Sequence, residues 1–287
     1  MRCSVHFPQT NFIKKGSHLS ALFLPYLCGR KVAEWMITMS NEIQSVARVF
    51  AIIEHLSNSP KAQPLKVIAS SCAIPPPTAH RFLNNLCSLG YVIREDDGRY
   101  KLSYKLFEIS SKALNQSSVI SIAKPYLDDM SERLGESVHL VVKNGNDVVY
   151  VYKITHAIGS IQMASKIGMR LPMYRCAVGK ALLAEMDDKK IEEVFSATEV
   201  VSVTPNTITE FDKLMEQIQI VRDLDYAVDN EENENGVICV ASALTSRSGE
   251  AKYAFSISTL TSRVTKKRMQ ELVSAVLETK HIIEERI

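Results

Sequence analysis

The sequence predicts an α+β protein in which a small winged helix-turn-helix domain precedes a larger domain of antiparallel strands and helices. Two patterns carry this prediction. Residues 43–102 contain three segments with helical spacing of apolar residues, followed by a hairpin signal. Residues 137–260 contain two pairs of alternating segments with helical stretches between them. At 287 residues, the chain is long enough for two domains with separate cores.

The composition is that of a folded protein, because 46% of the residues are hydrophobic and 23% are charged. The formal net charge is only +2, so any contact with nucleic acid must come from a local patch. The six cysteines are scattered and form no C-x-x-C pair, which predicts reduced thiols in a cytoplasmic protein without disulfides, metal site or cofactor. No apolar run approaches the roughly 20 residues that cross a bilayer, so no membrane partner is expected.

The first 39 residues do not fit either predicted domain. The stretch LSALFLPYLCG follows Lys14 and Lys15 and resembles the apolar centre of a signal peptide. It contains a proline, however, and lacks an A-x-A cleavage site. We therefore interpret residues 1–39 as a disordered or non-native extension, with Met36 or Met39 as the natural start.

Residues 40–102 have the element order of a winged helix. The second helix follows Pro64, and the third ends at Gly90. Asp97 and Gly98 then separate two alternating strands, which is the strongest short-range hairpin signal. The third helix buries an apolar face that contains Ala79, Phe82, Leu83 and Leu86. The first helix is expected to bury a stripe of apolar residues made of Val46, Val49, Phe50, Ile53 and Leu56.

The opposite face of the third helix is rich in side chains that reach phosphates and base edges in a DNA groove. A solvated polar face is the simpler alternative, but this face has few Glu and Lys residues. Residues 40–118 hold nine Lys and Arg against six Asp and Glu, a net charge of about +3. The expected DNA-binding residues are Thr78, His80, Arg81, Asn84, Asn85 and Ser88 on the helix, with Arg94 and Arg99 in the wing.

Three consecutive prolines, Pro75 to Pro77, stand where the third helix should begin. A residue before proline is pushed out of the helical region, so we expect Pro75 and Pro76 to stay extended. The helix should then begin at Pro77 or Thr78 and lose about one turn. Because proline has no N–H, the usual anion site at a helix start should be weakened. Phosphate contacts would shift to Thr78, Arg81 and the wing.

The C-terminal half predicts linker helices over 103–134, with Pro125 inside the second, and an α+β domain over 135–287. SVHLVVK and DVVYVYKI form the first expected hairpin, and SIQMAS is a possible third strand. GVICVASAL and AKYAFSIST form the second hairpin. Helices are expected near 175–185, 187–196 and 209–223, and from about 264.

Three features of this half could suggest catalysis or metal binding, and each has a simpler interpretation. The stretch VGKALL lacks the first glycine and the hydroxyl of a phosphate-binding loop, so Lys180 is interpreted as a surface or helix-start residue. Cys239 has no base tied to it in the sequence, since neither His139 nor His156 is linked to it, and is interpreted as a half-buried strand thiol. The acidic run Asp229, Glu231, Glu232 and Glu234 lacks calcium-loop spacing and is interpreted as a solvated loop.

A binding site fits the same half better. Ser256 and Ser258 alternate with apolar residues, so both hydroxyls should face one side of a strand. Residues 176–179 open a helix whose free N–H groups favour a carboxylate. Met163, Leu171 and Met173 are candidates for an apolar wall. The alternative is that the two serines only satisfy a sheet face.

Several segments in order resemble the IclR family of bacterial transcriptional regulators, from about Ile43 to the C-terminus. They include QSVARVFAIIEHL, HRFLNNLCSLGYV, RYKLSYKLFEIS, ERLGESVHLVV, LPMYRCAVGKALLA, DNEENENGVICVA and FSISTLTSRV. Thr78 and Arg81 match the family's DNA-binding helix, but the family has a hydroxyl and a basic residue where this chain has Pro75 to Pro77.

The resemblance implies a GAF-like C-terminal domain that binds a small molecule, and a linker region that helps to form a dimer. It implies effector contacts at the backbone of Ala177 and Val178 and at the side chains of Asp229, Cys239, Ser256 and Ser258. The motifs are most similar to those of the sugar-acid regulators of the family.

The expected protein is thus a homodimeric or homotetrameric repressor or activator of a catabolic operon, with a double-stranded DNA operator and a small organic acid effector. Two alternatives stay open. The first is an enzyme built on the sensor domain. The second is a regulator that responds to a protein partner, which a sealed apolar core behind Ser256 and Ser258 would favour.

Overall fold

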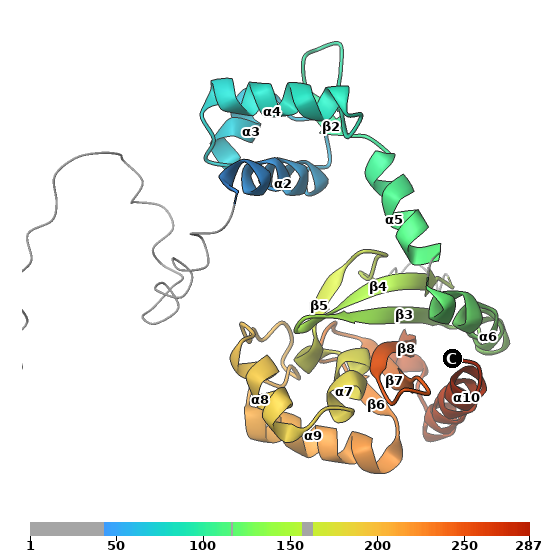
Figure 1. Ribbon diagram of the computed structural model, residues 1–287. Helices are drawn as coiled ribbons and strands as arrows, with labels where there is room; N and C mark the ends of the chain where they lie inside the picture. The colour runs from blue at the N-terminus through green and yellow to red at the C-terminus, as the bar shows by residue number, and fades with distance from the viewer. Residues whose placement is uncertain (1–42, 116, 157–162) are drawn as a thin grey trace, which may run out of the picture. The chain divides into compact units, whose positions relative to one another are not determined.

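The computed structural model describes residues 43–115, 117–156 and 163–287 (Figure 1). The interpretation of residues 1–39 as an extension therefore lies outside the described residues. The chain divides into two compact units, the first ending at Leu106 and the second beginning at Phe107. In the part of the chain that is described, no helix is both long and apolar enough to span a membrane.

From residue 43 onwards, the first unit contains three helices and a hairpin, as the sequence predicts. Gly98 occupies the left-handed region at φ +81° in the hairpin turn, a conformation that glycine adopts without strain. Backbone hydrogen bonds of 2.8 Å join Gln63 and Tyr100 in both directions and tie the hairpin to the segment before α3. The elements are α2 (Gln44–Ser57), α3 (Leu65–Ser71), α4 (Pro76–Ser88), β1 (Val92–Arg94) and β2 (Tyr100–Leu102).

The buried face of α2 differs from the predicted stripe. Ile52 and Leu56 enter the core, and Ile52 has no exposed surface. Val46 and Phe50, which were expected inside, are 49% and 55% exposed. The cause is that α2 carries apolar side chains around more than one face, so spacing alone does not select the face that packs.

The start of α4 also differs from the prediction. The helix begins at Pro76, not at Pro77 or Thr78, and only Pro75 is extended, with φ −55° and ψ 136°. The N–H groups of Thr78 and Ala79 both donate to the Pro75 carbonyl at 2.9 Å and complete the first turn. Proline suits the first positions of a helix because its φ is already near the helical value and an N–H would have no partner there.

The second unit is an α+β domain, which confirms the predicted fold class. The strand next to β4 is β5, which lies later in the chain than the predicted third strand SIQMAS, and part of SIQMAS falls at 157–162, outside the described residues. Helix α5 (Lys105–Asn115) contains the boundary between the two units. The other elements are α6 (Ser118–Leu134), β3 (Ser137–Asn144), β4 (Asp147–Ile154), β5 (Arg170–Pro172), the 3-10 helix η2 (Met173–Arg175), α7 (Ala177–Ala184), α8 (Asp188–Ser196), α9 (Phe211–Leu224), β6 (Ala227–Asn230), β7 (Val237–Thr245), β8 (Ala251–Leu260), η3 (Thr261–Arg263) and α10 (Lys266–Glu284).

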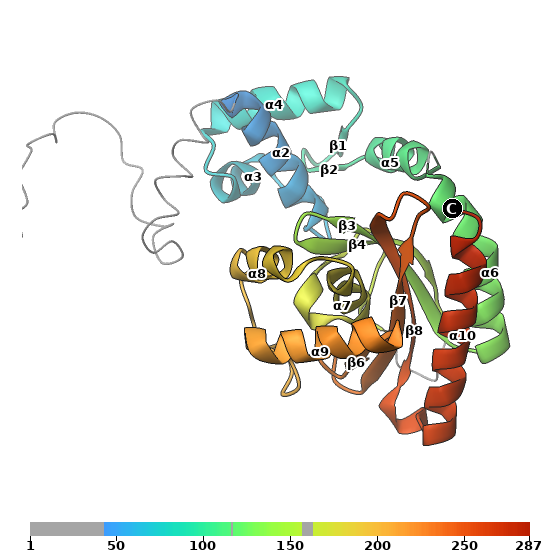
Figure 2. The ribbon, with the colours of Figure 1, turned by 60° about the horizontal axis from the view of Figure 1, so that its bottom comes forward.

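An antiparallel sheet with the order β5-β4-β3-β8-β7-β6 forms the centre of this unit. Helices α6 and α10 pack on one face of the sheet, and α7, α8 and α9 lie on the other (Figure 2). Each face has its own apolar core. Phe255 and Ile257 of β8 point into the core beneath α10, whereas Ala254 points into the core beneath α7. The polar residues of the candidate site share the face of Ala254.

Candidate functional site

A row of polar side chains crosses the sheet on the α7 side. Asp229 on β6 pairs with Cys239 on β7, and Cys239 pairs with Ser258 on β8. On the other side of β8, Ser256 pairs with His139 on the neighbouring strand β3. Because residues two apart on a strand face the same side, Ser256 and Ser258 both point towards α7, as the sequence predicts.

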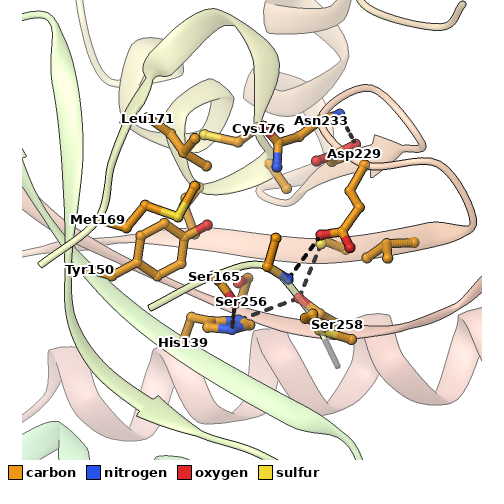
Figure 3. A pocket seen from close by; sticks show the side chains of 17 residues that line it. His139, Tyr150, Ser165, Met169, Leu171, Cys176, Asp229, Asn233, Ser256 and Ser258 are labelled. Atoms are coloured by element: carbon orange, nitrogen blue, oxygen red, sulfur yellow. Dashed lines mark hydrogen bonds between the residues drawn. The ribbon is translucent and has the colours of Figure 1, made fainter. Parts of the chain in front are cut away.

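These side chains form the floor of a small pocket, with a cavity volume of about 40 Å³, which is partly open to solvent (Figure 3). The roof is the start of α7, and the walls come from the segment after residue 162 and from the loop between β6 and β7. Eight predicted effector residues line the pocket: Met163, Leu171, Ala177, Val178, Asp229, Cys239, Ser256 and Ser258. Several residues that sequence reasoning missed also line it, among them His139, Tyr150, Ser165, Met169, Cys176, Asn233 and Glu234.

Met173 is not part of the pocket lining, which corrects its assignment to the apolar wall. It is buried beneath α7, where its backbone lies against Gly179. A Cβ atom on Gly179 would be only 2.2 Å from the Met173 carbonyl oxygen. Gly179 therefore allows the close approach that sets the position of α7 over the sheet.

The N-terminus of α7 supplies two backbone donors at the pocket. Neither the Ala177 nor the Val178 N–H has a hydrogen-bond acceptor among the described residues, whereas the Lys180 N–H donates to the Cys176 carbonyl at 2.9 Å. The first turn of α7 contains no acidic residue. Free N–H groups and the positive end of the helix dipole together favour an anion.

A chain of hydrogen bonds runs along the pocket floor. The Ser258 hydroxyl donates to Cys239 Sγ at 3.0 Å and lies 3.4 Å from His139 Nδ1. His139 Nε2 lies 2.9 Å from Ser165 Oγ, and Lys153 Nζ donates to the same Ser165 oxygen at 2.9 Å. The sequence contains no local signal for this chain, because its members come from four strands (β3, β4, β7 and β8) and a connecting segment.

Burial sets the charge of the groups on the floor. Burial, and secondarily the positive charge of Lys153, lowers the pKa of His139 to about 3, so the ring is neutral at physiological pH. Burial raises the pKa of the Cys239 thiol well above its ordinary value, with a smaller contribution from Asp229. Cys239 is therefore a thiol that acts as a neutral polar group, in agreement with its interpretation as a strand thiol.

Asp229 is a carboxyl group of the pocket floor, and only 4% of the residue is exposed. Its Oδ1 accepts the N–H groups of Glu232 at 2.7 Å and Asn233 at 3.4 Å. Burial, followed by the charge of Glu232, raises the pKa of Asp229 to about 7. The side chain can therefore be a donor or an acceptor to a ligand near neutral pH.

Lys180 lies near the start of α7, as one of the two interpretations had it, but it is not a surface residue. The acidic run is not a solvated loop, because Asp229 and Glu232 are buried. Lys180 has no exposed surface, and its ammonium donates to both carboxylate oxygens of Glu232, at 2.6 and 2.8 Å. The hydroxyls of Thr204 and Thr207 donate hydrogen bonds to the backbone carbonyl of Glu232, at 3.2 and 2.7 Å. Burial forces this charged pair to form, since an unpaired charge in the interior is costly.

In the first unit, the predicted DNA-binding residues lie on the exposed side of α4 and in the wing. All of them are exposed except Thr78, which is half-buried, while Phe82 and Leu83 on the other side of α4 are in the core. Two wing cations are paired locally: Arg99 with Asp97 at 3.1 Å and Lys101 with Glu95 at 2.6 Å. At the tip of α4 no backbone N–H is free, because the prolines have none and Thr78 donates to Pro75.

A winged helix-turn-helix unit joined to an α+β domain with a polar pocket is the organisation of a DNA-binding transcription regulator. Comparison with known families agrees. The family described as "Bacterial transcriptional regulator IclR C-terminal" matches residues 111–284, and the "IclR helix-turn-helix domain" matches residues 45–96. The chain belongs to the IclR family of bacterial transcriptional regulators, which confirms the resemblance seen in the sequence.

Individual relatives support the same assignment. The HTH-type transcriptional regulator KdgR of Escherichia coli is 32% identical over 240 residues, which cover 83% of this chain and 90% of KdgR. The DNA-binding transcriptional repressor YiaJ of Escherichia coli is 31% identical and covers 84% of this chain and 86% of its own length. The crystal structure of the Thermotoga maritima IclR is 31% identical with a TM-score of 0.72, covering 85% of this chain and 99% of that one.

Proposed function

We propose that this regulator controls a catabolic operon in the cytoplasm and that its pocket binds a small carboxylate, with a sugar acid as the favoured class. The observation that carries the proposal is the pocket itself. Two serine hydroxyls and the free N–H groups of Ala177 and Val178 line one pocket. Hydroxyl groups, together with the free N–H groups of a helix N-terminus, donate hydrogen bonds that favour a negatively charged oxygen.

The remaining lining fits the rest of a sugar acid. Asp229 and Asn233 offer polar atoms that can pair with the hydroxyls of the ligand, and Met163 and Leu171 form an apolar wall. Pockets that combine an apolar wall with a few convergent polar groups are typical small-molecule sites. A polar pocket also supports a small ligand over a protein partner, which a sealed apolar core behind the serines would have favoured.

We also propose that residues 40–102 form the DNA-binding domain, residues 103–134 the linker helices and residues 135–287 the effector-binding domain. Exposed polar residues of α4, with Arg81 and Asn84 at their centre, would contact a DNA operator. Val46 and Phe50 on α2 are exposed, as is Ile43 just before the helix. These exposed apolar residues support a homodimer or homotetramer, because such patches usually pack against another chain. Two copies would bind a partly palindromic operator.

A binding assay on the full chain tests the proposal. Operator duplexes are first selected from a random library, and their affinity is then measured with and without D-gluconate, D-galacturonate and acetate. Since coupling between two sites is reciprocal, an acid that changes operator affinity must bind with an affinity that the operator changes by the same factor. D-Glucitol, which lacks the carboxylate of gluconate, is the matched control and should have no effect.

Two variants separate the two proposed sites. Ser256→Ala/Ser258→Ala should lose the response to the acid but keep operator binding, because only pocket donors are removed. Arg81→Ala/Asn84→Ala should lose operator binding and keep acid binding. If no acid changes operator affinity in the wild-type chain, the effector part of the proposal fails. Conversion of a bound acid to product would favour the enzyme alternative instead.

A further inference from the structure

The hydrogen-bond chain on the pocket floor connects a charged residue near the pocket to a predicted ligand contact. It runs from the ammonium of Lys153 through Ser165 and His139 to Ser258, and ends at Cys239. Figure 3 shows His139 between Ser165 and Ser258. Each link is between side-chain atoms 2.9 to 3.4 Å apart.

The ammonium group fixes the direction of this chain, because it can donate hydrogen bonds but cannot accept them. Lys153 donates to Ser165 Oγ, so the Ser165 hydroxyl hydrogen is available for His139 Nε2. A neutral imidazole has one donor and one acceptor nitrogen. With Nε2 as acceptor, Nδ1 carries the hydrogen and donates to Ser258 Oγ.

The opposite direction leaves a donor without an acceptor. If His139 Nε2 donated to Ser165, that oxygen would accept from both His139 and Lys153. Its own hydrogen would then have no acceptor among the side chains and backbone that the structure describes. The direction that begins at Lys153 gives the hydrogens of Ser165, His139 and Ser258 one acceptor each, whereas the opposite direction leaves the half-buried Ser165 hydroxyl without one.

The surroundings of His139 hold the ring in one state. It is 3% exposed and lies edge-on to Tyr150, with the ring centres 5.3 Å apart. The lowered pKa of about 3 keeps the ring neutral, as the donor and acceptor pattern requires. The ring orientation is thus set by three contacts, to Ser165, Ser258 and Tyr150.

We propose that Lys153, Ser165 and His139 are positioning residues that make Ser258 a hydrogen-bond donor to a ligand oxygen. His139 Nδ1–H occupies one lone pair of Ser258, and the Ser258 hydrogen, which points to Cys239 in the unliganded pocket, turns to the ligand. The ligand oxygen that accepts this hydrogen bond therefore lies above β8 on the pocket floor. This inference rests on the proposed function, since it concerns the same ligand.

The tautomer of His139 can be measured without any ligand. In ¹⁵N-labelled full-length protein at pH 7.5, the long-range ¹⁵N–¹H pattern should show that Nδ1 carries the hydrogen and Nε2 does not. Lys153→Met removes the ammonium donor that fixes the tautomer. The ¹⁵N chemical shifts of His139 Nδ1 and Nε2 should therefore move towards each other in this variant. Lys166→Met is the matched control, because Lys166 is exposed, lies near enough to Lys153 to lower the pKa of Lys153, and its ammonium makes no hydrogen bond to the Ser165 hydroxyl.

Binding of D-gluconate measured by calorimetry tests the consequence for the ligand. Lys153→Met should weaken binding by about tenfold, a typical loss for one charge-assisted hydrogen-bond network. Lys166→Met should weaken binding by no more than about twofold, the effect of a screened exposed charge. His139→Asn keeps a donor near the Nδ1 position and should retain more affinity than His139→Leu, although both lose the ring.

The outcomes separate this inference from the proposed function. Gluconate binding by the wild type together with an Nε2–H tautomer, or equal losses in Lys153→Met and Lys166→Met, overturns the positioning role and leaves the proposed function standing. If gluconate, galacturonate and acetate all fail to bind while the Nδ1–H tautomer is present, the ligand class is wrong, and with it the role assigned to Ser258. Binding with the expected tautomer and the expected order of variants supports both.

Discussion

Lys180 of α7 and Glu232 of the loop between β6 and β7 form a buried ion pair, with Lys180 Nζ 2.6 and 2.8 Å from the two Glu232 carboxylate oxygens. The pair joins the helix that forms the roof of the pocket to the loop that forms one wall. Glu232 follows Asp229 by three residues, and its N–H donates to the Asp229 carboxylate. The ion pair therefore fixes a pocket residue as well as the fold around it.

Removal of one partner of this pair should be strongly destabilising. In Lys180→Met, the Glu232 carboxylate stays buried without its counter-charge, which costs about 3–5 kcal/mol in comparable pairs. We expect this loss in the free energy of unfolding of the second unit, measured by urea denaturation at pH 7.5. Lys190→Met is the control, because its pair with Glu193 is more than half exposed and should contribute less than about 1 kcal/mol.

The double variant Lys180→Met/Glu232→Met removes both charges and should recover part of the lost stability. A single Lys180→Met variant as stable as Lys190→Met would show that Glu232 finds solvent or another partner. That result would also remove the argument that the pair holds the loop against α7.

The local parts of the fold were predictable from the sequence because short-range rules decide them. Alternation in β8 placed Ser256 and Ser258 on one face, and an Asp-Gly pair placed the turn of the wing. The apolar face of α4 was also found correctly, since Phe82 and Leu83 recur at helical spacing. The family resemblance then supplied six of the residues that line the pocket.

Features that depend on long-range packing were not predictable in this way. Lys180 and Glu232 are 52 residues apart, and no pattern in the sequence marks them as partners. His139 and Ser258 are 119 residues apart and meet only because β3 and β8 are neighbours in the sheet. Phe50 was assigned to the core because helical spacing shows a stripe but not what covers it.

Gly179→Ala should disturb the pocket by changing the position of α7, which forms its roof. A Cβ at this position would be 2.2 Å from the Met173 carbonyl oxygen, so the helix must move or the chain must strain. Overpacking of this kind costs about 1–3 kcal/mol. We expect a lower melting temperature and weaker binding of any carboxylate ligand. Because the clash is with backbone, adding Met173→Ala should not rescue the variant; a rescue would place the clash in the side chain.

Asp229 should make the stability of the second unit depend on pH. Its pKa is raised from 3.8 to about 7 in the folded protein, so the folded state holds a proton that the unfolded chain has already lost. Stability from this group is therefore greatest at low pH and falls as pH rises from about 4 to about 7. Asp229→Asn keeps an oxygen to accept the Glu232 N–H and should be more stable than the wild type at pH 8 by at least about 1 kcal/mol.

The measurement for Asp229 is ligand-free urea denaturation at pH 5 and pH 8. The difference in unfolding free energy between wild type and Asp229→Asn should be larger at pH 8, where the wild-type carboxylate is charged. A difference that does not change with pH would mean that Asp229 ionises as an ordinary carboxyl group. Glu284→Gln is a useful comparison, because burial also raises the pKa of Glu284 but this residue is outside the pocket.

Replacement of Pro75, Pro76 and Pro77 by Ser-Lys-Ser should strengthen non-specific DNA binding and steepen its salt dependence. The native tip of α4 has no free N–H, since the prolines have none and the N–H groups of Thr78 and Ala79 both donate to Pro75. The replacement adds N–H groups, hydroxyls and a cation where a phosphate can bind. Each added phosphate contact should steepen the plot of log affinity against log salt by about 0.9. Ser-Ala-Ser restores the N–H groups without the cation and should give a smaller change. The slopes are measured by fluorescence anisotropy on a random duplex, and an unchanged slope in the Ser-Lys-Ser variant would show that the tip of α4 does not approach the DNA backbone.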